Sequence, residues 1–224
     1  MSGLTGEMPD AIDTTLAAAL NDRTMIGQVL IQRTNGDAFA LCHRDDEGRI
    51  DLEVFRDAED AIEIARFDDA GSYRPLKTAP NLRHSWRLEV GDVREMRRAL
   101  DHLYPARLAL LAAWRQNRLA TTSLRDTLDR QSGMYRIAAK ISDEQIDEIV
   151  GDFCKSNGGC LRTILWKRDA SESVPSRKLP PEKFDPAHDQ TGRGERAIPL
   201  LCQEICNLLV AECRKAVKGE AKME

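Results

Sequence analysis

Apolar positions in the first half of the chain alternate with polar ones in several short runs. Residues 25–33 and 37–44 are two such runs, and the Asn35-Gly36 step between them is typical of a β-hairpin turn. Residues 50–55 and 84–90 are also rich in strand-forming side chains. The pattern therefore predicts a small mixed β-sheet built around one hairpin.

Helical periodicity occupies the segments between and after these strands. Helices are expected over residues 10–20, 57–67, 92–104, 106–119 and 124–132. Asp57, Asp92 and Ser123 stand where a helix N-cap is preferred, and Pro105 separates two of the helices. Packed against the sheet, these helices define an α+β domain.

The pattern changes at residue 134, where a strand-like run reaches residue 141. Ser142 and Gln145 then form a capping box that opens a helix ending at Cys154. A buried strand is expected over 161–167, and a helix over 200–217 that starts after Pro199. This second, smaller part is expected to have an α/β fold.

The resulting domain organisation has a loose boundary near residue 133. We expect an N-terminal helical segment (1–24), an α+β domain (25–133), a smaller α/β domain (134–218) and a tail (219–224). Within the second domain, residues 169–198 are rich in Pro, Ser, Gly and charge, which predicts a flexible connector.

Composition narrows the function classes. The 224 residues carry a net charge of −4, so no basic excess points to nucleic acid or to an anionic membrane. Neither a secretory signal nor an apolar stretch of membrane-spanning length is present in the sequence, so a cytoplasmic location is expected. A homo-oligomer stays open.

Cysteine placement is the main chemical signal. Of six cysteines, five lie in the last third of the chain, with the spacing C-x5-C, a 41-residue gap and C-x3-C. Cys154, Cys160, Cys202 and Cys206 are the candidate ligands. In the expected helix, Cys202 and Cys206 lie one turn apart, with Cβ atoms about 5–6 Å from each other. That separation suits an iron–sulfur cluster better than a tetrahedral zinc, without excluding zinc.

Two other roles for these thiols remain open on spacing alone. Free cysteine is a common small core residue, and a disulfide or redox pair is a third reading. The expected helix start favours a thiolate at Cys202, and Lys155 and Arg162 offer compensating charge. Cys213 lies two turns beyond Cys206, about 10 Å along the axis, so both it and Cys42 are expected in the core.

A family resemblance adds to this reading. It is carried by Leu124-Arg125, Leu128, Arg130-Gln131, Gly133-Met134-Tyr135-Arg136, Cys154, Gly158-Gly159-Cys160 and the Cys202-x3-Cys206 pair. With the runs at 79–90 and 99–108, they resemble the C-terminal part of multidomain sirohydrochlorin cobaltochelatase-like proteins. The resemblance implies an accessory domain followed by a domain that binds a [4Fe–4S] cluster through Cys154, Cys160, Cys202 and Cys206.

The resemblance does not extend to the chelatase module. That module needs well over a hundred residues and a metal-inserting histidine near its start, and here His43 is the first histidine. We therefore expect no chelatase activity and assign no catalytic residue. The function expected is electron transfer or redox sensing linked to tetrapyrrole or cobalamin-type metabolism, with a chelatase-like or redox partner protein. A structural module fastened by zinc or a cluster, or a small redox enzyme, is the alternative.

Other polar groups give weaker signals. His43, His84, His102 and His188 lack metal-ligand spacing, and the acidic run 57–63 is typical of a solvated helix face. Three arginines, at positions 125, 130 and 136, either hold an anionic ligand or form ordinary ion pairs, and the second reading is favoured.

Overall fold

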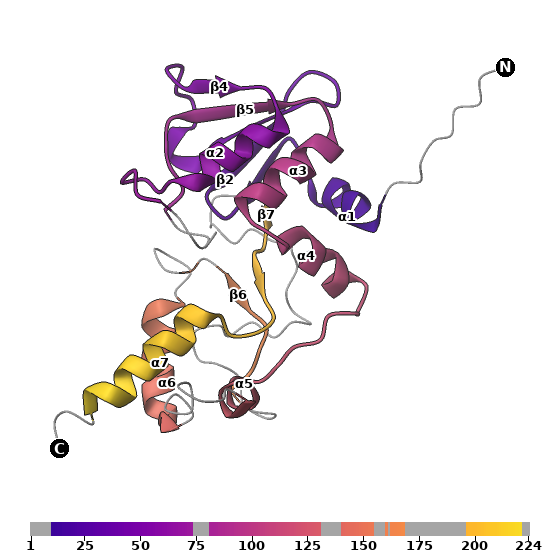
Figure 1. Cartoon of the computed structure of the whole chain (residues 1–224). Coiled ribbons are helices and arrows are strands. Elements are labelled where there is room, and N and C mark those ends of the chain that lie inside the picture. The colour runs from indigo at the N-terminus through magenta and orange to yellow at the C-terminus, as the bar shows by residue number, and fades with distance from the viewer. Residues whose placement is uncertain are drawn as a thin grey trace. The chain divides into compact units, whose positions relative to one another are not determined.

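The computed structural model describes residues 10–73, 81–130, 140–154, 160, 162–168 and 196–220. The chain forms two compact units that divide between Asn117 and Arg118 (Figure 1). Residues 196–198 return to the first unit, and residues 199–220 belong to the second.

A six-stranded mixed sheet, in the order β4-β5-β3-β2-β1-β7, forms the first unit's framework. The pairs β1–β2, β2–β3 and β3–β5 are antiparallel, whereas β4–β5 and β1–β7 are parallel. The strands are β1 (Arg23–Ile26), β2 (Val29–Arg33), β3 (Phe39–His43), β4 (Glu53–Phe55), β5 (Trp86–Val90) and β7 (Arg196–Ile198). The expected mixed sheet with packed helices is therefore confirmed.

The strand expected over 25–33 is in fact two strands joined by a tight turn. Gly27 takes a φ of 58°, in the left-handed region where glycine has no steric penalty. This turn reverses the chain between β1 and β2. The Asn35-Gly36 turn was expected, and Gly36 has a φ of 69° between β2 and β3.

In its described residues the first unit has four α-helices, each within a segment that the sequence predicted to be helical. They are α1 (Ala11–Ala19), α2 (Ala61–Arg66), α3 (Val93–Leu103) and α4 (Arg107–Arg115), with 3-10 turns η1 (Arg44–Asp46) and η2 (Ala58–Asp60). Asp92 caps α3 by accepting the Glu95 N–H at 2.9 Å, and Asp57 with Asp60 forms a capping box at η2. These caps fix where α3 and η2 begin, whereas α4 follows Ala106 with no side-chain cap.

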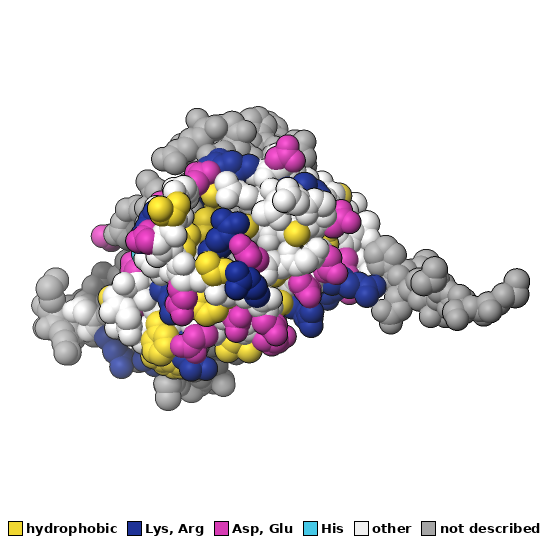
Figure 2. Space-filling view, turned by 90° about the horizontal axis from the view of Figure 1, so that it is seen from above, with side chains coloured by type: hydrophobic (Ala, Val, Ile, Leu, Met, Phe, Trp, Pro, Cys, Tyr) yellow, Lys and Arg dark blue, Asp and Glu magenta, His cyan; other side chains and the backbone are white. Residues whose placement is uncertain are grey.

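Charged side chains of both signs are intermixed over the face drawn in Figure 2. Several are paired within the first unit, among them Arg49 with Asp51 and Arg83 with Glu53, each at 2.7 Å. Within the part of the chain that the structure describes, no helix has the length and apolarity that a membrane crossing demands.

The second unit consists of three helices and a two-stranded parallel sheet in its described residues. These are α5 (Leu124–Arg130), α6 (Asp143–Phe153), β6 (Thr163–Ile164), β8 (Leu201–Cys202) and α7 (Asn207–Glu220). The predicted Ser142–Gln145 capping box is present at α6, with Ser142 Oγ accepting the Gln145 N–H at 3.2 Å. Side chains from all five elements meet in one apolar core.

The prediction of a helix over 200–217 is wrong for its first residues. Leu201 and Cys202 form β8, which pairs with β6, and α7 begins only at Asn207. Leu200 and Leu201 are buried, and the Leu200 and Cys202 carbonyls accept N–H groups from Thr163 and Leu165. A strand partner thus overrides the tendency of Pro199 to start a helix.

Two further expectations differ in extent. The two units divide before residue 118, whereas the sequence pattern placed a boundary near 133, and the strand expected over 161–167 is regular only at β6. Four segments lie wholly or mostly outside the described residues. They are the strand expected over 134–141, the connector expected over 169–198, the first nine residues and the tail beyond residue 220.

Candidate metal centre

Four cysteines of the second unit line one small pocket. The pocket is lined by Cys154, Cys160, Cys202 and Cys206, which lie up to some fifty positions apart in the sequence. The other lining residues are Arg162, Ile164, Trp166, Ile205 and Leu209. The structure thus brings together the four thiols that the sequence singled out.

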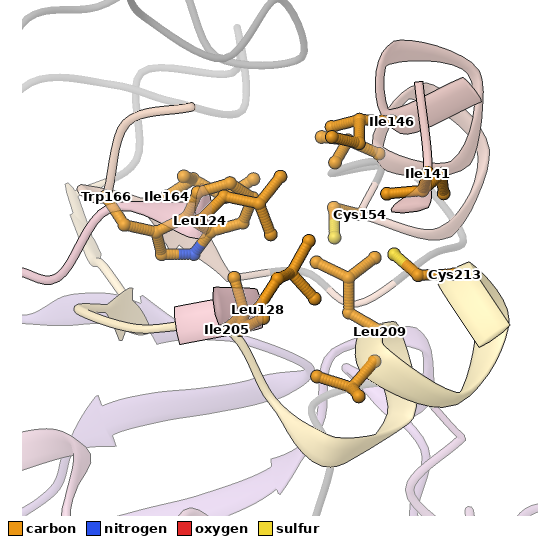
Figure 3. Close-up of a cluster of buried hydrophobic side chains, with 12 residues drawn as sticks. Leu124, Leu128, Ile141, Ile146, Cys154, Ile164, Trp166, Ile205, Leu209 and Cys213 are labelled. Atoms are coloured by element: carbon orange, nitrogen blue, oxygen red, sulfur yellow. The ribbon is translucent and has the colours of Figure 1, made fainter. Parts of the chain in front are cut away.

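Helix α6 positions the first of these thiols. Ile146 and Val150 are buried on the face of α6 that packs into the core. Cys154 follows as the C-cap residue, with its N–H donating to the Val150 carbonyl at 3.0 Å. Its side chain is buried among the core residues and its sulfur is visible there in Figure 3. The capping box at Ser142 therefore sets the register that delivers Cys154.

Strand β8 positions the third thiol. Cys202 pairs in register with Ile164 of β6, and the Cys202 carbonyl accepts the Leu165 N–H at 2.9 Å. Neighbouring residues in a parallel pair point to the same face, and side chains two positions apart in an extended segment also share a face. Ile164 and Trp166 accordingly line the same pocket as Cys202.

The fourth thiol belongs to the N-cap residue of α7. The Cys206 carbonyl accepts the Val210 N–H at 3.2 Å, which is the first hydrogen bond of the helix. The expectation that Cys202 occupies the first turn of a helix is therefore wrong, and Cys206 is the cysteine at the start of α7.

Two hydrogen bonds reach the Cys202 sulfur. Trp166 Nε1 donates to Cys202 Sγ at 3.4 Å, and Sγ donates in turn to the Glu204 carbonyl at 3.1 Å. Burial raises the pKa of the Cys202 thiol, whereas the Trp166 N–H and the positive charge of Arg162 lower it. Both polar neighbours therefore favour the ionised sulfur that a metal requires.

The donor set fits a cluster of soft metal ions. All four candidate ligands are sulfur, the ligand type that iron–sulfur clusters use, and the pocket wall is otherwise apolar apart from Arg162. Arg162 offers a positive charge opposite the net negative charge of a cluster held by four thiolates. Lys155, which the sequence also suggested as a compensating charge, and Gly158-Gly159 lie outside the described residues.

The remaining two cysteines are core residues, as expected. Cys213 is 1% exposed and packs with Leu209 and Val210 in the same apolar core as Cys154 (Figure 3). Cys42 is buried in the first unit beside Met25. Burial raises the pKa of each of these two thiols to about 11, so both are protonated at neutral pH.

A second group of possible ligands lies in the first unit. His43, Asp45 and His84 each offer a donor atom within 4.8 Å of the others, although their spacing gave no signal. Buried His43 caps η1, because its Nδ1 accepts the Asp45 N–H at 3.2 Å. That bond uses the Nδ1 lone pair and leaves the proton on Nε2. The ring thus offers a metal no unused lone pair, and we read His43 as structural.

The other polar candidates take part in ordinary contacts. Arg125 pairs with Asp143 and donates to the Ile141 carbonyl, and His102 contacts Glu59 at 3.1 Å. His188, Arg136 and the Arg130 side chain lie outside the described residues. The sequence did not predict the contact of Trp166 with the Cys202 sulfur. The pattern that could have indicated it is the alternation of Ile164 and Trp166 in a segment close to the cysteines.

Comparison with known families gives the class of protein. Residues 13–118 match the family model of the DR2241 stabilising domain, and residues 116–215 match a 4Fe-4S iron-sulfur cluster binding domain. The chain is thus similar to a DR2241 stabilising domain followed by a 4Fe-4S cluster binding domain, and its cofactor is a [4Fe–4S] cluster. No curated protein sequence matches it.

A solved structure shows a particular relative. The chain matches DR2241 from Deinococcus radiodurans, described as a multi-domain protein with structural similarity to chelatases and with two additional novel domains. The TM-score is 0.70 at 26% sequence identity, over 95% of this chain and 43% of that one. The chain therefore spans less than half the length of this relative. The resemblance to the accessory and cluster parts of chelatase-like multidomain proteins is confirmed.

Proposed function

We propose that Cys154, Cys160, Cys202 and Cys206 are the four ligands of the [4Fe–4S] cluster and that the protein transfers single electrons. The observation that carries this proposal is the convergence of the four thiols on one pocket. Each iron of such a cluster then has a protein thiolate, and no iron is left open for substrate. Electron transfer suits a site of this kind better than chemistry on a bound substrate does.

The surroundings of the pocket support a redox role. Ile164, Ile205 and Leu209 restrict access of water to the sulfurs, and Arg162 and Trp166 offer positive charge and a hydrogen bond. Charge, burial and hydrogen bonds to sulfur are the means by which a protein sets a cluster's reduction potential. Because the relative is similar to chelatases, we place the electron transfer in tetrapyrrole or cobalamin-type metabolism, with a chelatase-like or redox protein as partner.

A direct experiment is reduction of the anaerobically purified full chain. We expect a brown protein that takes up one electron per chain from dithionite and then gives the EPR signal of a reduced [4Fe–4S] cluster. Cys206→Ser should lose both colour and signal, whereas Cys213→Ala, the matched control in the neighbouring core, should keep them. A colourless protein containing zinc would overturn the proposal.

One observation favours a structural role as the second candidate. The proposed ligands lie at the end of α6, on β8 and at the start of α7, so a cluster would fasten three elements of the second unit. Metal binding then contributes directly to folding. If the cluster is present but cannot be reduced or oxidised at accessible potentials, while its removal unfolds the second unit, this structural function replaces electron transfer.

A further inference from the structure

The indole of Trp166 makes a contact that neither the family match nor the proposed ligand set assigns. Trp166 is 3% exposed and belongs to the apolar core of the second unit. A buried indole N–H needs an acceptor, since leaving it unpaired is costly. Its acceptor here is the Cys202 sulfur, at 3.4 Å, and not a backbone carbonyl.

We propose that Trp166 is a positioning residue that raises the reduction potential of the cluster through its N–H bond to Cys202 Sγ. The inference rests on the proposed ligand set, in which Cys202 binds an iron. The hydrogen bond is local, it involves one of the four sulfurs, and it comes from a side chain that the core holds in place.

The two hydrogen bonds at Cys202 respond differently to ligation. A thiolate accepts hydrogen bonds but has no proton to donate, so the contact from Sγ to the Glu204 carbonyl is lost. The bond from Trp166 is strengthened, because a donor facing an ionised sulfur is charge-assisted. Of these two hydrogen bonds, the one from Trp166 is therefore the one that survives when Cys202 is a ligand.

The direction of the effect follows from charge. One electron from an external reductant makes the cluster and its thiolates one unit more negative, with no bond made or broken. A fixed N–H aimed at a ligand sulfur stabilises the more negative state more strongly. Removing the N–H therefore lowers the reduction potential. The core must also hold the indole rigidly, and Ile164, Ile205 and Leu209 line the same pocket.

The test removes the N–H group of Trp166 in two ways. Trp166→Phe removes it along with part of the ring, and the benzothiophene analogue of tryptophan, incorporated at position 166, removes it while keeping the bicyclic shape. The matched control is Trp86→Phe, since Trp86 is also fully buried but donates to the Arg83 carbonyl in the first unit. All proteins are the full chain, purified anaerobically and titrated against redox mediators.

We expect both changes at position 166 to lower the midpoint potential and Trp86→Phe to leave it unchanged. At a fixed potential the ratio of reduced to oxidised cluster should fall about three- to tenfold, and tenfold corresponds to about 59 mV for a one-electron couple. An unchanged midpoint with the analogue overturns the inference, even if Trp166→Phe shifts it, because repacking is then the cause. Absence of any cluster from the unmodified chain overturns the proposed function itself.

Discussion

At the scale of single residues, burial decides which thiols are reactive. Cys42 and Cys213 are buried in apolar surroundings that raise the pKa of each thiol to about 11. Reactivity requires the thiolate, so both should resist iodoacetamide at pH 8 in the folded protein and react fully in urea. Mass spectrometry of digested peptides measures this. Rapid alkylation of either thiol without denaturant would show that its core opens readily.

His43 gives the first unit a defined acid sensitivity. Burial first, and then the neighbouring His84, lower the pKa of His43 to about 4, although Asp45 and Asp46 act in the opposite sense. The unfolded chain takes up a proton near pH 6.5, and the folded chain does so only near pH 4. The free energy of unfolding is therefore at its full value above pH 6.5. It falls by about 3 kcal/mol in total as the pH drops toward 4, because the unfolded chain then binds a proton that the folded chain does not.

The variant that isolates this effect is His43→Asn, which keeps an acceptor for the Asp45 N–H but does not titrate. We expect the free energy of unfolding of the unmodified first unit to fall between pH 6.5 and 4 more steeply than that of the variant. Hydrogen exchange over residues 29–43 in urea reports on this unit. Parallel pH profiles for the two proteins would contradict the assignment.

At the scale of elements, the cap of α6 should matter for the site because Cys154 ends that helix. Ser142→Ala removes the acceptor of the Gln145 N–H and should destabilise the second unit by about 1 kcal/mol. Ser142→Asp retains an acceptor and is the matched control. Urea unfolding of both variants measures the difference, and equal loss in both would show that the cap hydrogen bond is not the cause.

The sequence predicted correctly those turns and helix starts that are specified by residues next to them in the chain. The Asn35-Gly36 hairpin, the Asp92 cap and the Ser142–Gln145 box each lie within a few residues of the structure they specify. The apolar run at 197–202 has no such signal, because its strands form only with partners distant in sequence. The run is as long as a buried strand. Pro199 is also typical of a helix start, however, and the sequence alone therefore predicted a helix.

The site shows the same division. Clustering of four cysteines identified the candidate ligands without any knowledge of the fold, because thiol chemistry is specific. The hydrogen bond from Trp166 depends on β6 lying beside β8, and the N-cap position of Cys206 depends on where α7 begins. Sequence patterns give residue types at a site more readily than they give the contacts between them.

At the scale of the whole molecule, the chain leaves and re-enters the first unit. Residues 118–168 belong to the second unit, but β7 is an edge strand of the first unit's sheet. Ile198 of β7 is 3% exposed and pairs in register with Ile26 of β1. The first unit is therefore completed by a segment close in sequence to Cys202.

This connectivity predicts that a change in β7 weakens the first unit. Ile198→Ala should cost about 2–4 kcal/mol, as expected for a large-to-small change in a core. Val54→Ala, on the exposed strand β4 at the opposite edge of the same sheet, should cost far less. Urea midpoints followed by hydrogen exchange over β1 and β2 compare the two. A similar small loss in both would show that β7 contributes little.

We propose that the thiols of four cysteines hold one [4Fe–4S] cluster. The most direct test of this proposal is the iron and acid-labile sulfide content of the anaerobically purified chain, compared across six single Cys→Ser variants. We predict about four irons and four sulfides per chain, retained in the variants at Cys42 and Cys213 and lost in those at Cys154, Cys160, Cys202 and Cys206. Full iron and sulfide content in any of these last four variants would show that its cysteine is not a ligand.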